Sequence, residues 1–144
     1  MVISLVFWLT ACNLVPTPQP TPTEEPTAVI LNLNSTFWLL DTLDGENPIP
    51  VTNITLAFID GWATGESGCN SYAGEYTATA EGDLGIPFII STQVLCDDPP
   101  GVMEQEEIYQ NILDEVYQFG IVDGKLRLDS EGGRYLSFVN IQLP

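Results

Sequence analysis

The chain contains no histidine, and this absence excludes the commonest catalytic base and metal ligand of proteins. Serine and cysteine nucleophiles usually pass their proton to an imidazole, so Ser-His-Asp and Cys-His catalysis are both excluded. Zinc sites built on histidine are excluded for the same reason. A carboxylate or a lysine could still act as a base, although Lys125 is the only lysine. We therefore expect that the protein is not an enzyme.

Positive charge is nearly as scarce as histidine. Three Lys and Arg stand against 20 Asp and Glu, which gives a formal net charge of −17. Such a surface repels phosphate backbones and anionic lipid headgroups, so we expect no nucleic-acid partner. Cations or basic proteins are better matched in charge. The alternative is that the acidic surface only keeps an exported domain soluble.

No apolar run is long enough to span a bilayer, which takes about 20 residues. The run Val2–Leu9 instead matches the apolar region of a secretory signal peptide over residues 1–11. The tetrapeptide LTAC that ends at Cys12 resembles the bacterial lipobox, although the usual basic residues before the apolar run are missing. The resemblance implies cleavage before Cys12 and a lipid on its thiol. The alternative is a short apolar N-terminus with an incidental cysteine.

Proline is concentrated just after this cysteine. The segment NLVPTPQPTPTEEPT, residues 13–27, carries five prolines and little that could enter a core. Proline-rich chains favour the extended polyproline II conformation at about 3.1 Å per residue, so the segment could reach roughly 40 Å. We interpret residues 12–33 as a tether between a membrane anchor and a folded domain at 34–144.

The folded part carries several strand signals. Thr36–Asp41 is rich in aromatic and aliphatic residues, and Ile54, Leu56 and Phe58 alternate along the next apolar stretch. A further strand is expected over residues 83–90, at an edge or a bulge because it contains Pro87. Near the C-terminus, apolar stretches at 121–122, 125–129 and 134–140 are separated by glycine-containing turns. They predict a three-stranded antiparallel meander.

One helix is predicted, over VMEQEEIYQNILDEVYQF, residues 102–119, with Gly120 as its C-terminal glycine. The apolar side chains at helical spacing are Ile108, Tyr109, Ile112, Leu113 and Val116. We interpret this stripe as core, and the acidic first turns as favourable for the helix dipole. Together the elements predict an α+β domain, in which a curved antiparallel sheet packs around one main helix.

Five segments carry a family resemblance. In order, GESGCNSYAGEY, STQVLC, MEQEEIYQNIL, GKLRL and YLSF resemble the META/HslJ domain over Thr36 to about Val139, although Val94-Leu95 replaces the family's frequent Met-Ala. The resemblance implies a partial barrel that belongs to the cell envelope or is secreted, often as a lipoprotein. The family is associated with heat-shock and stress responses and has no established reaction. The motif residues that it marks are Gly68, Asn70, Tyr72, Gly74, Tyr76, Thr92 and Glu106.

Cys69 and Cys96 remain once Cys12 is lipidated. In an oxidising compartment this even pair predicts a disulfide. A two-cysteine metal site, a redox thiol and two inert free thiols stay open as alternatives. Around the pair, Gly68 would permit a close backbone approach or a positive φ, and the Asn70 side chain would hydrogen-bond the local turn.

Two acidic clusters could bind calcium through carboxylate oxygens. One is Asp97 and Asp98 with Glu104 nearby, and the other is formed by Asp41, Asp44 and Glu46. Neither has the spacing of an EF-hand. We interpret both as solvated turns and predict no metal site and no cofactor.

We therefore expect a lipid-anchored cell-envelope domain that faces the periplasm or the cell exterior. It would bind or stabilise an envelope protein, or bind a small ligand, and it would contact the membrane only through the lipid on Cys12. Two alternatives remain. The first is an envelope enzyme that uses carboxylates or a metal. The second is an exported inhibitor of a protease or lysozyme, which would need a rigid exposed loop such as 93–101, held by Cys96.

Overall fold

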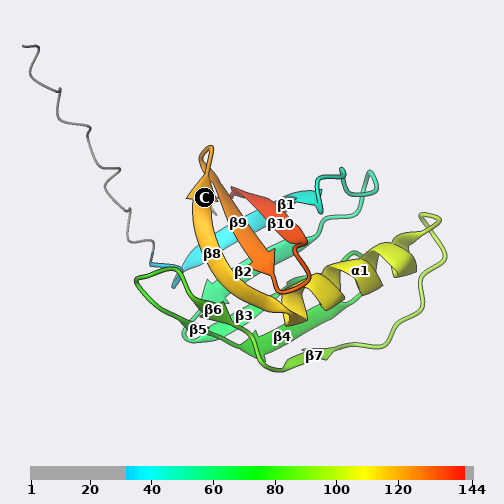
Figure 1. The fold of residues 1–144 in the computed structure, drawn as a ribbon. Helices are drawn as coiled ribbons and strands as arrows, with labels where there is room; N and C mark the ends of the chain where they lie inside the picture. Colours follow the sequence, from blue (N-terminus) through cyan, green and yellow to red (C-terminus); the bar gives the residue numbers. More distant parts are fainter. Residues whose placement is uncertain (1–31, 142–144) are drawn as a thin grey trace, which may run out of the picture.

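The computed structural model describes residues 32–141, where strands follow one another in a curled antiparallel sheet (Figure 1). The order of the eight strands in this sheet is β7-β4-β3-β2-β1-β10-β9-β8. Their bounds are β1 Thr36–Leu43, β2 Thr55–Ile59, β3 Trp62–Glu66, β4 Ser71–Glu75, β7 Ile89–Ser91, β8 Val116–Val122, β9 Lys125–Ser130 and β10 Tyr135–Asn140. Two short strands, β5 Thr77–Ala78 and β6 Leu84–Gly85, form a second small sheet.

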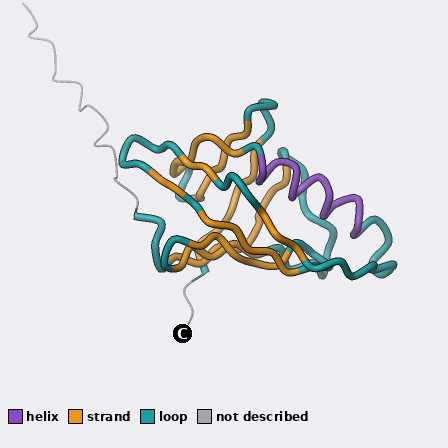
Figure 2. The backbone as a smooth tube through the Cα atoms, turned by 90° about the horizontal axis from the view of Figure 1, so that it is seen from below, coloured by secondary structure: helices purple, strands orange, loops and turns teal. Residues whose placement is uncertain are grey.

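The sheet curls into a half-barrel, and α1, Val102–Asp114, lies at its open side (Figures 1 and 2). The buried face of α1 carries Tyr109, Ile112 and Leu113, all with no measurable exposure. This face packs on the inner side of the sheet, where β9 and β10 contact the helix. The predicted α+β architecture with a partial barrel around one helix is therefore confirmed.

Alternating side chains place one face of β2 in the core, and β2 lies beside β1 at the centre of the sheet. Leu56 and Phe58 of β2 are fully buried, as predicted, and they follow the buried Ile54. The Asp60-Gly61 turn then joins β2 to β3 with positive φ at both residues, 49° and 86°. Tight hairpins with two such residues match the twist of the strands that they join.

The predicted end of the helix is wrong. The helix stops at Asp114, and Val116–Val122 forms β8, which pairs along its length with β9. Gly120 is therefore a strand residue and not a helix terminator. Val116 follows the apolar spacing of the helix, but Phe119 is buried from the strand and lies opposite Leu128. Ile108, predicted to be core, is 42% exposed.

The strand expected over residues 83–90 is divided in the structure. Leu84–Gly85 forms β6, whereas Ile89–Ser91 forms β7 after the break that contains Pro87. The predicted edge position is confirmed for β7, which is the terminal strand of the large sheet. Strands β3 and β4 were not predicted, because their sequence was interpreted only as a motif.

The predicted signal peptide at 1–11, the lipidated Cys12 and nearly all of the tether at 12–33 lie outside the described residues, and these remain predictions. Within residues 32–141, no helix combines the length and apolar character needed to cross a bilayer.

Candidate functional site

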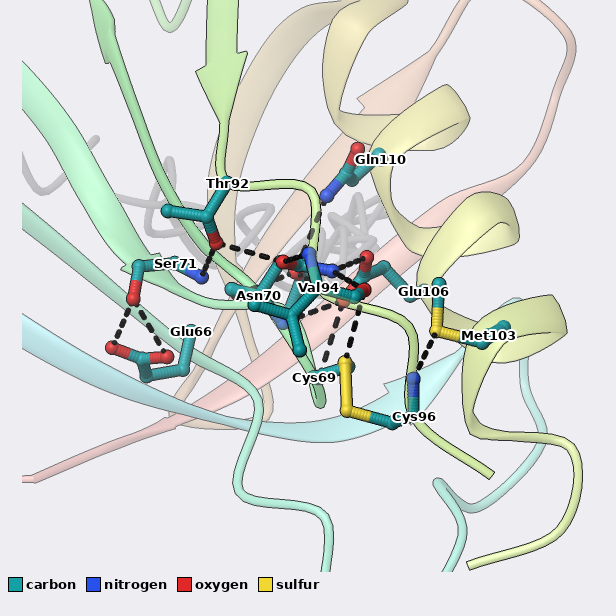
Figure 3. The surroundings of a disulfide bond; sticks show 11 residues. Glu66, Cys69, Asn70, Ser71, Thr92, Val94, Cys96, Met103, Glu106 and Gln110 are labelled. Carbon is teal, nitrogen blue, oxygen red and sulfur yellow. Dashed lines mark hydrogen bonds between the residues drawn. A yellow bond between two sulfur atoms is a disulfide. The ribbon is translucent and has the colours of Figure 1, made fainter. Parts of the chain in front are cut away.

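The motif segments meet around the carboxylate of Glu106, which is only 6% exposed (Figure 3). Its Oε2 accepts hydrogen bonds from the backbone N–H groups of Cys69 and Asn70, at 3.1 and 2.8 Å, and lies 2.8 Å from the Ser67 hydroxyl. Its Oε1 accepts a bond from Asn70 Nδ2 at 2.7 Å. Helix α1 is thereby fixed to the loop between β3 and β4. We call this set of residues the motif junction: Ser67, Cys69, Asn70, Thr92, Val94, Cys96 and Glu106.

Gly68 makes this arrangement sterically possible. Its φ is +113°, a conformation that side chains with a Cβ rarely adopt, as predicted from the sequence. A Cβ at this position would also lie 3.4 Å from Val102 on α1. The backbone turns here so that the consecutive amides of Cys69 and Asn70 both point at one carboxylate oxygen, which forms a small anion-binding concavity. The anion that occupies it is the protein's own Glu106.

The Asn70 side chain extends the junction to the loop after β7. Its Oδ1 accepts hydrogen bonds from the Thr92 hydroxyl and the Val94 amide, both at 2.7 Å. Its Nδ2 donates to the Val94 carbonyl oxygen at 2.9 Å as well as to Glu106. The amide group therefore uses both of its donors and both acceptor positions. Asn70 does more than the local turn bonding that the sequence predicted, because it holds a segment 24 residues away.

A disulfide joins Cys69 to Cys96 beside these bonds, as predicted (Figure 3). The two cysteines are 27 residues apart, and a closed loop of that length stabilises a fold by roughly 3–4 kcal/mol on the chain-entropy model. The Cys96 amide also donates to the sulfur of Met103 at 3.4 Å. The loop is consequently held at Val94 and again at Cys96.

Tyr72 connects the motif to the core. Its hydroxyl donates to the Thr55 carbonyl oxygen at 2.8 Å and accepts from the Tyr109 hydroxyl at 2.6 Å. Burial raises the pKa of Tyr72 well above the usual tyrosine value, and the neighbouring Tyr109 raises it further. Burial likewise raises the pKa of Tyr109. Both hydroxyls are therefore neutral at physiological pH and serve as hydrogen-bonding groups.

Gly74 and Tyr76 have packing roles. A Cβ on Gly74 would lie 2.4 Å from the Phe88 carbonyl oxygen, so only glycine lets the chain that enters β7 approach β4 this closely. The Tyr76 ring meets Phe58 edge to face, with 4.8 Å between the ring centroids. All seven predicted motif residues therefore contribute to hydrogen bonding, backbone geometry or packing.

The carboxylates of the two acidic clusters do not come together as calcium ligands would. Asp97, Asp98 and Glu104 are all exposed. In the second cluster, Asp41 forms an ion pair with Lys125 at 2.8 Å. Over residues 32–141, no three cysteine or acidic side chains come together closely enough to hold one metal ion.

Sequence reasoning missed the side-chain contacts of Gln105 and Gln110 and the burial of Glu106. The Gln105 side chain accepts from the Ile49 amide and donates to the Thr52 hydroxyl at 3.0 Å, while Gln110 donates to the Ser67 hydroxyl at 3.2 Å. A usable signal was present in the sequence. The buried helix residues share one helical face, and Gln105 and Glu106 lie on it with Val102, Tyr109, Ile112 and Leu113.

Carboxylates also line one groove, of about 310 Å³, beside α1. Its acidic residues are Glu104, Glu106 and Glu107, and Gln93 from the segment after β7 also lines it. The Glu106 oxygens are already occupied by the donors of the motif junction. The groove is therefore left with the two exposed carboxylates, Glu104 and Glu107, which suit the attraction of a cation better than paired acid–base chemistry.

Solved structures share this fold. A protein from Burkholderia xenovorans determined by NMR is 23% identical with a TM-score of 0.64, and the match covers 90% of this chain and all of that one. A second NMR structure is 19% identical with a TM-score of 0.60, over 74% of this chain and 90% of the other. The crystal structure of a DUF4847 family protein from Bacteroides vulgatus ATCC 8482 is 15% identical with a TM-score of 0.53, over 78% and 96%.

No curated protein matches the chain. The family model of the META domain matches residues 31–142, which include every described residue and all seven motif positions. The chain belongs to the META domain family.

Proposed function

We propose that the protein is a cell-envelope META domain that acts by binding a partner, without catalysing a reaction. Its family membership supports an envelope-associated domain of this kind. The lipobox-like LTAC and the proline-rich segment after it support a lipid anchor on Cys12 and a tether. The domain would face the periplasm or the cell exterior, and the family's association with stress supports a role in stabilising envelope proteins.

One observation carries the proposal, namely that the motif junction positions an exposed loop. Val94 is bonded through both its amide and its carbonyl group to Asn70, yet its side chain is 56% exposed. Leu95 is 88% exposed, and Cys96 beyond it is held by the disulfide. Val94 and Leu95 are therefore adjacent exposed apolar residues on a loop that is fixed at Val94 and at Cys96, and a loop preorganised in this way loses little conformational entropy when it binds a partner.

The same observation favours a second candidate function, an exported inhibitor of a protease or lysozyme. That function requires a rigid exposed loop, and the segment 93–101 is both exposed at Leu95 and held at Cys96. Inhibition of purified proteases and of lysozyme by the protein, lost in Leu95→Asp, would support this candidate. Binding of an envelope protein through Leu95, without inhibition of any hydrolase, would support the first.

Photo-crosslinking in living cells tests the proposed function. A photoreactive amino acid is placed at Leu95 and, as the matched control, at Val51, which is 85% exposed in the connection between β1 and β2. We expect discrete crosslinked envelope proteins from position 95 and none from position 51. Equal or absent crosslinking at the two positions would contradict binding through this loop.

Membrane fractionation tests the anchor separately. Cys12→Ser removes the thiol that would carry the lipid, so we expect the variant to leave the membrane fraction. Thr10→Ser keeps the cysteine and serves as the control. Retention of Cys12→Ser in the membrane would contradict lipid anchoring.

A further inference from the structure

Three depressions lie in succession along the segment Phe88–Gln93, which we call the β7 strip. The first, of about 210 Å³, is lined by Trp62, Ala73, Gly74, Glu75, Pro87, Phe88 and Ile90. The second, of about 400 Å³, shares Ala73 and Ile90 with the first and continues to Thr92. The third is the acidic groove between Gln93 and α1. The first two depressions adjoin at Ala73 and Ile90, and Gln93 of the third follows Thr92 of the second in the chain.

The first part of the strip is apolar and exposed. Phe88 is 76% exposed, Ile90 67% and Trp62 45%, and the three side chains line the same hollow. Strand β7 ends the large sheet, so this hollow lies at the sheet's edge. Exposed apolar side chains that gather around a hollow are typical of an interaction surface, whereas isolated ones need no explanation.

The far end of the strip has the opposite character, because Glu104 and Glu107 line the groove there. The chain has three cationic side chains, and each forms an ion pair elsewhere in the domain, with N–O distances of 2.8 to 3.1 Å. They are Lys125, Arg127 and Arg134, paired with Asp41, Asp129 and Glu115. The groove therefore keeps an unneutralised negative charge, which favours a cationic ligand.

We propose that the β7 strip binds a peptide segment of another protein in which apolar residues are followed by lysine or arginine. Its apolar side chains would cover Phe88, Ile90 and Trp62, and its cations would lie beside Glu104 and Glu107. A second copy of this chain fits poorly, because it would bring a second net charge of −17 to the acidic groove without a free cation to match it. The inference rests on the proposed binding function and names the chemistry of the partner.

Defined peptides test the inference with the full chain. The probe is a fluorescein-labelled peptide of about ten residues, roughly 33 Å when extended, with an apolar half and a lysine half. One comparison peptide has glutamate in place of lysine, and another has serine in place of the apolar residues. We expect saturable binding of the probe by fluorescence anisotropy, and binding weaker by about tenfold or more for each comparison peptide.

Two lysine substitutions on opposite edges of the sheet locate the binding surface. Ile90→Lys alters the β7 strip, and Ile121→Lys places the same charge on exposed β8. We expect Ile90→Lys to weaken probe binding by about tenfold or more and Ile121→Lys to leave it nearly unchanged. Circular dichroism verifies that both variants are folded. Glu107→Gln should weaken binding of the probe, with the exposed Glu131→Gln as its control.

Several results would overturn the inference. These are failure of the probe to bind, equal binding of the glutamate peptide, equal effects of the two lysine variants, or self-association of the chain through the β7 strip. Crosslinks from Leu95 to an envelope protein, together with no peptide binding at the strip, would refute this inference while leaving the proposed function intact. If the photoreactive residue at position 95 forms no crosslinks to envelope proteins, the proposed function itself is refuted.

Discussion

Replacing Glu106 by glutamine tests the energetic importance of the motif junction. The substitution keeps the size of the side chain and converts one carboxylate oxygen into an N–H₂ group. If the remaining oxygen stays with the two backbone amides, the new donor faces Asn70 Nδ2, which is itself a donor. A buried donor left without an acceptor costs about 1–3 kcal/mol. The bonds that remain also lose their charge assistance, which makes such bonds roughly twice as strong as neutral ones.

We therefore expect Glu106→Gln to lower the free energy of unfolding by about 3 kcal/mol, out of a total of about 5–15 kcal/mol for a domain. For about 100 residues this corresponds to a fall in Tm of about 10–15 °C. Thermal and urea unfolding, followed by circular dichroism with the disulfide intact, measure the change. The adjacent Glu107→Gln, on the exposed side of α1, is the matched control and should stay within about 0.5 kcal/mol of the wild type. Equal small effects of the two substitutions would refute the reasoning.

Three other predictions follow from the same geometry. Burial raises the pKa of Tyr109, so above about pH 10 the unfolded chain releases a proton that the folded chain retains. Urea unfolding should therefore show a loss of stability as the pH rises above about 10, and this loss should be smaller in Tyr109→Phe. Gly74→Ala should cost about 1–3 kcal/mol in thermal unfolding because its Cβ would meet a backbone oxygen, whereas Gly120→Ala, with open space around it, should not. Reducing the disulfide should lower unfolding stability by roughly 3–4 kcal/mol, and a chain equally stable in reductant would contradict its bracing role.

The sequence predicted the fold class because its strongest signals are local. The alternation of Ile54, Leu56 and Phe58 is a property of neighbouring residues, and the structure confirms that all three side chains are buried. The prediction of where the helix ends was wrong for a physical reason. Val116 continues the helical spacing from Ile112, and only the pairing of β8 with β9 turns the residues after Asp114 into a strand.

The sequence predicted which residues belong to the candidate site, but not how these residues are arranged. The family resemblance identified Asn70 and Glu106 as motif residues, and the even pair of cysteines predicted the disulfide. Nothing local showed that Glu106 is buried, because its partners lie 36 to 39 residues away and its neighbour Glu107 is exposed. The position of Glu106 on the same helical face as Tyr109 and Leu113 was the available signal.

The amide hydrogen exchange of Val94 tests most directly the claim that the motif junction holds the exposed loop. Its N–H donates to Asn70 Oδ1 at 2.7 Å, although the Val94 side chain is 56% exposed. We predict that this amide is protected to the same extent as amides of β4, and that Asn70→Ala removes the protection while β1 and β2 stay protected. Rapid exchange of the Val94 amide in the wild-type protein would show that the loop is not held, and would contradict the account.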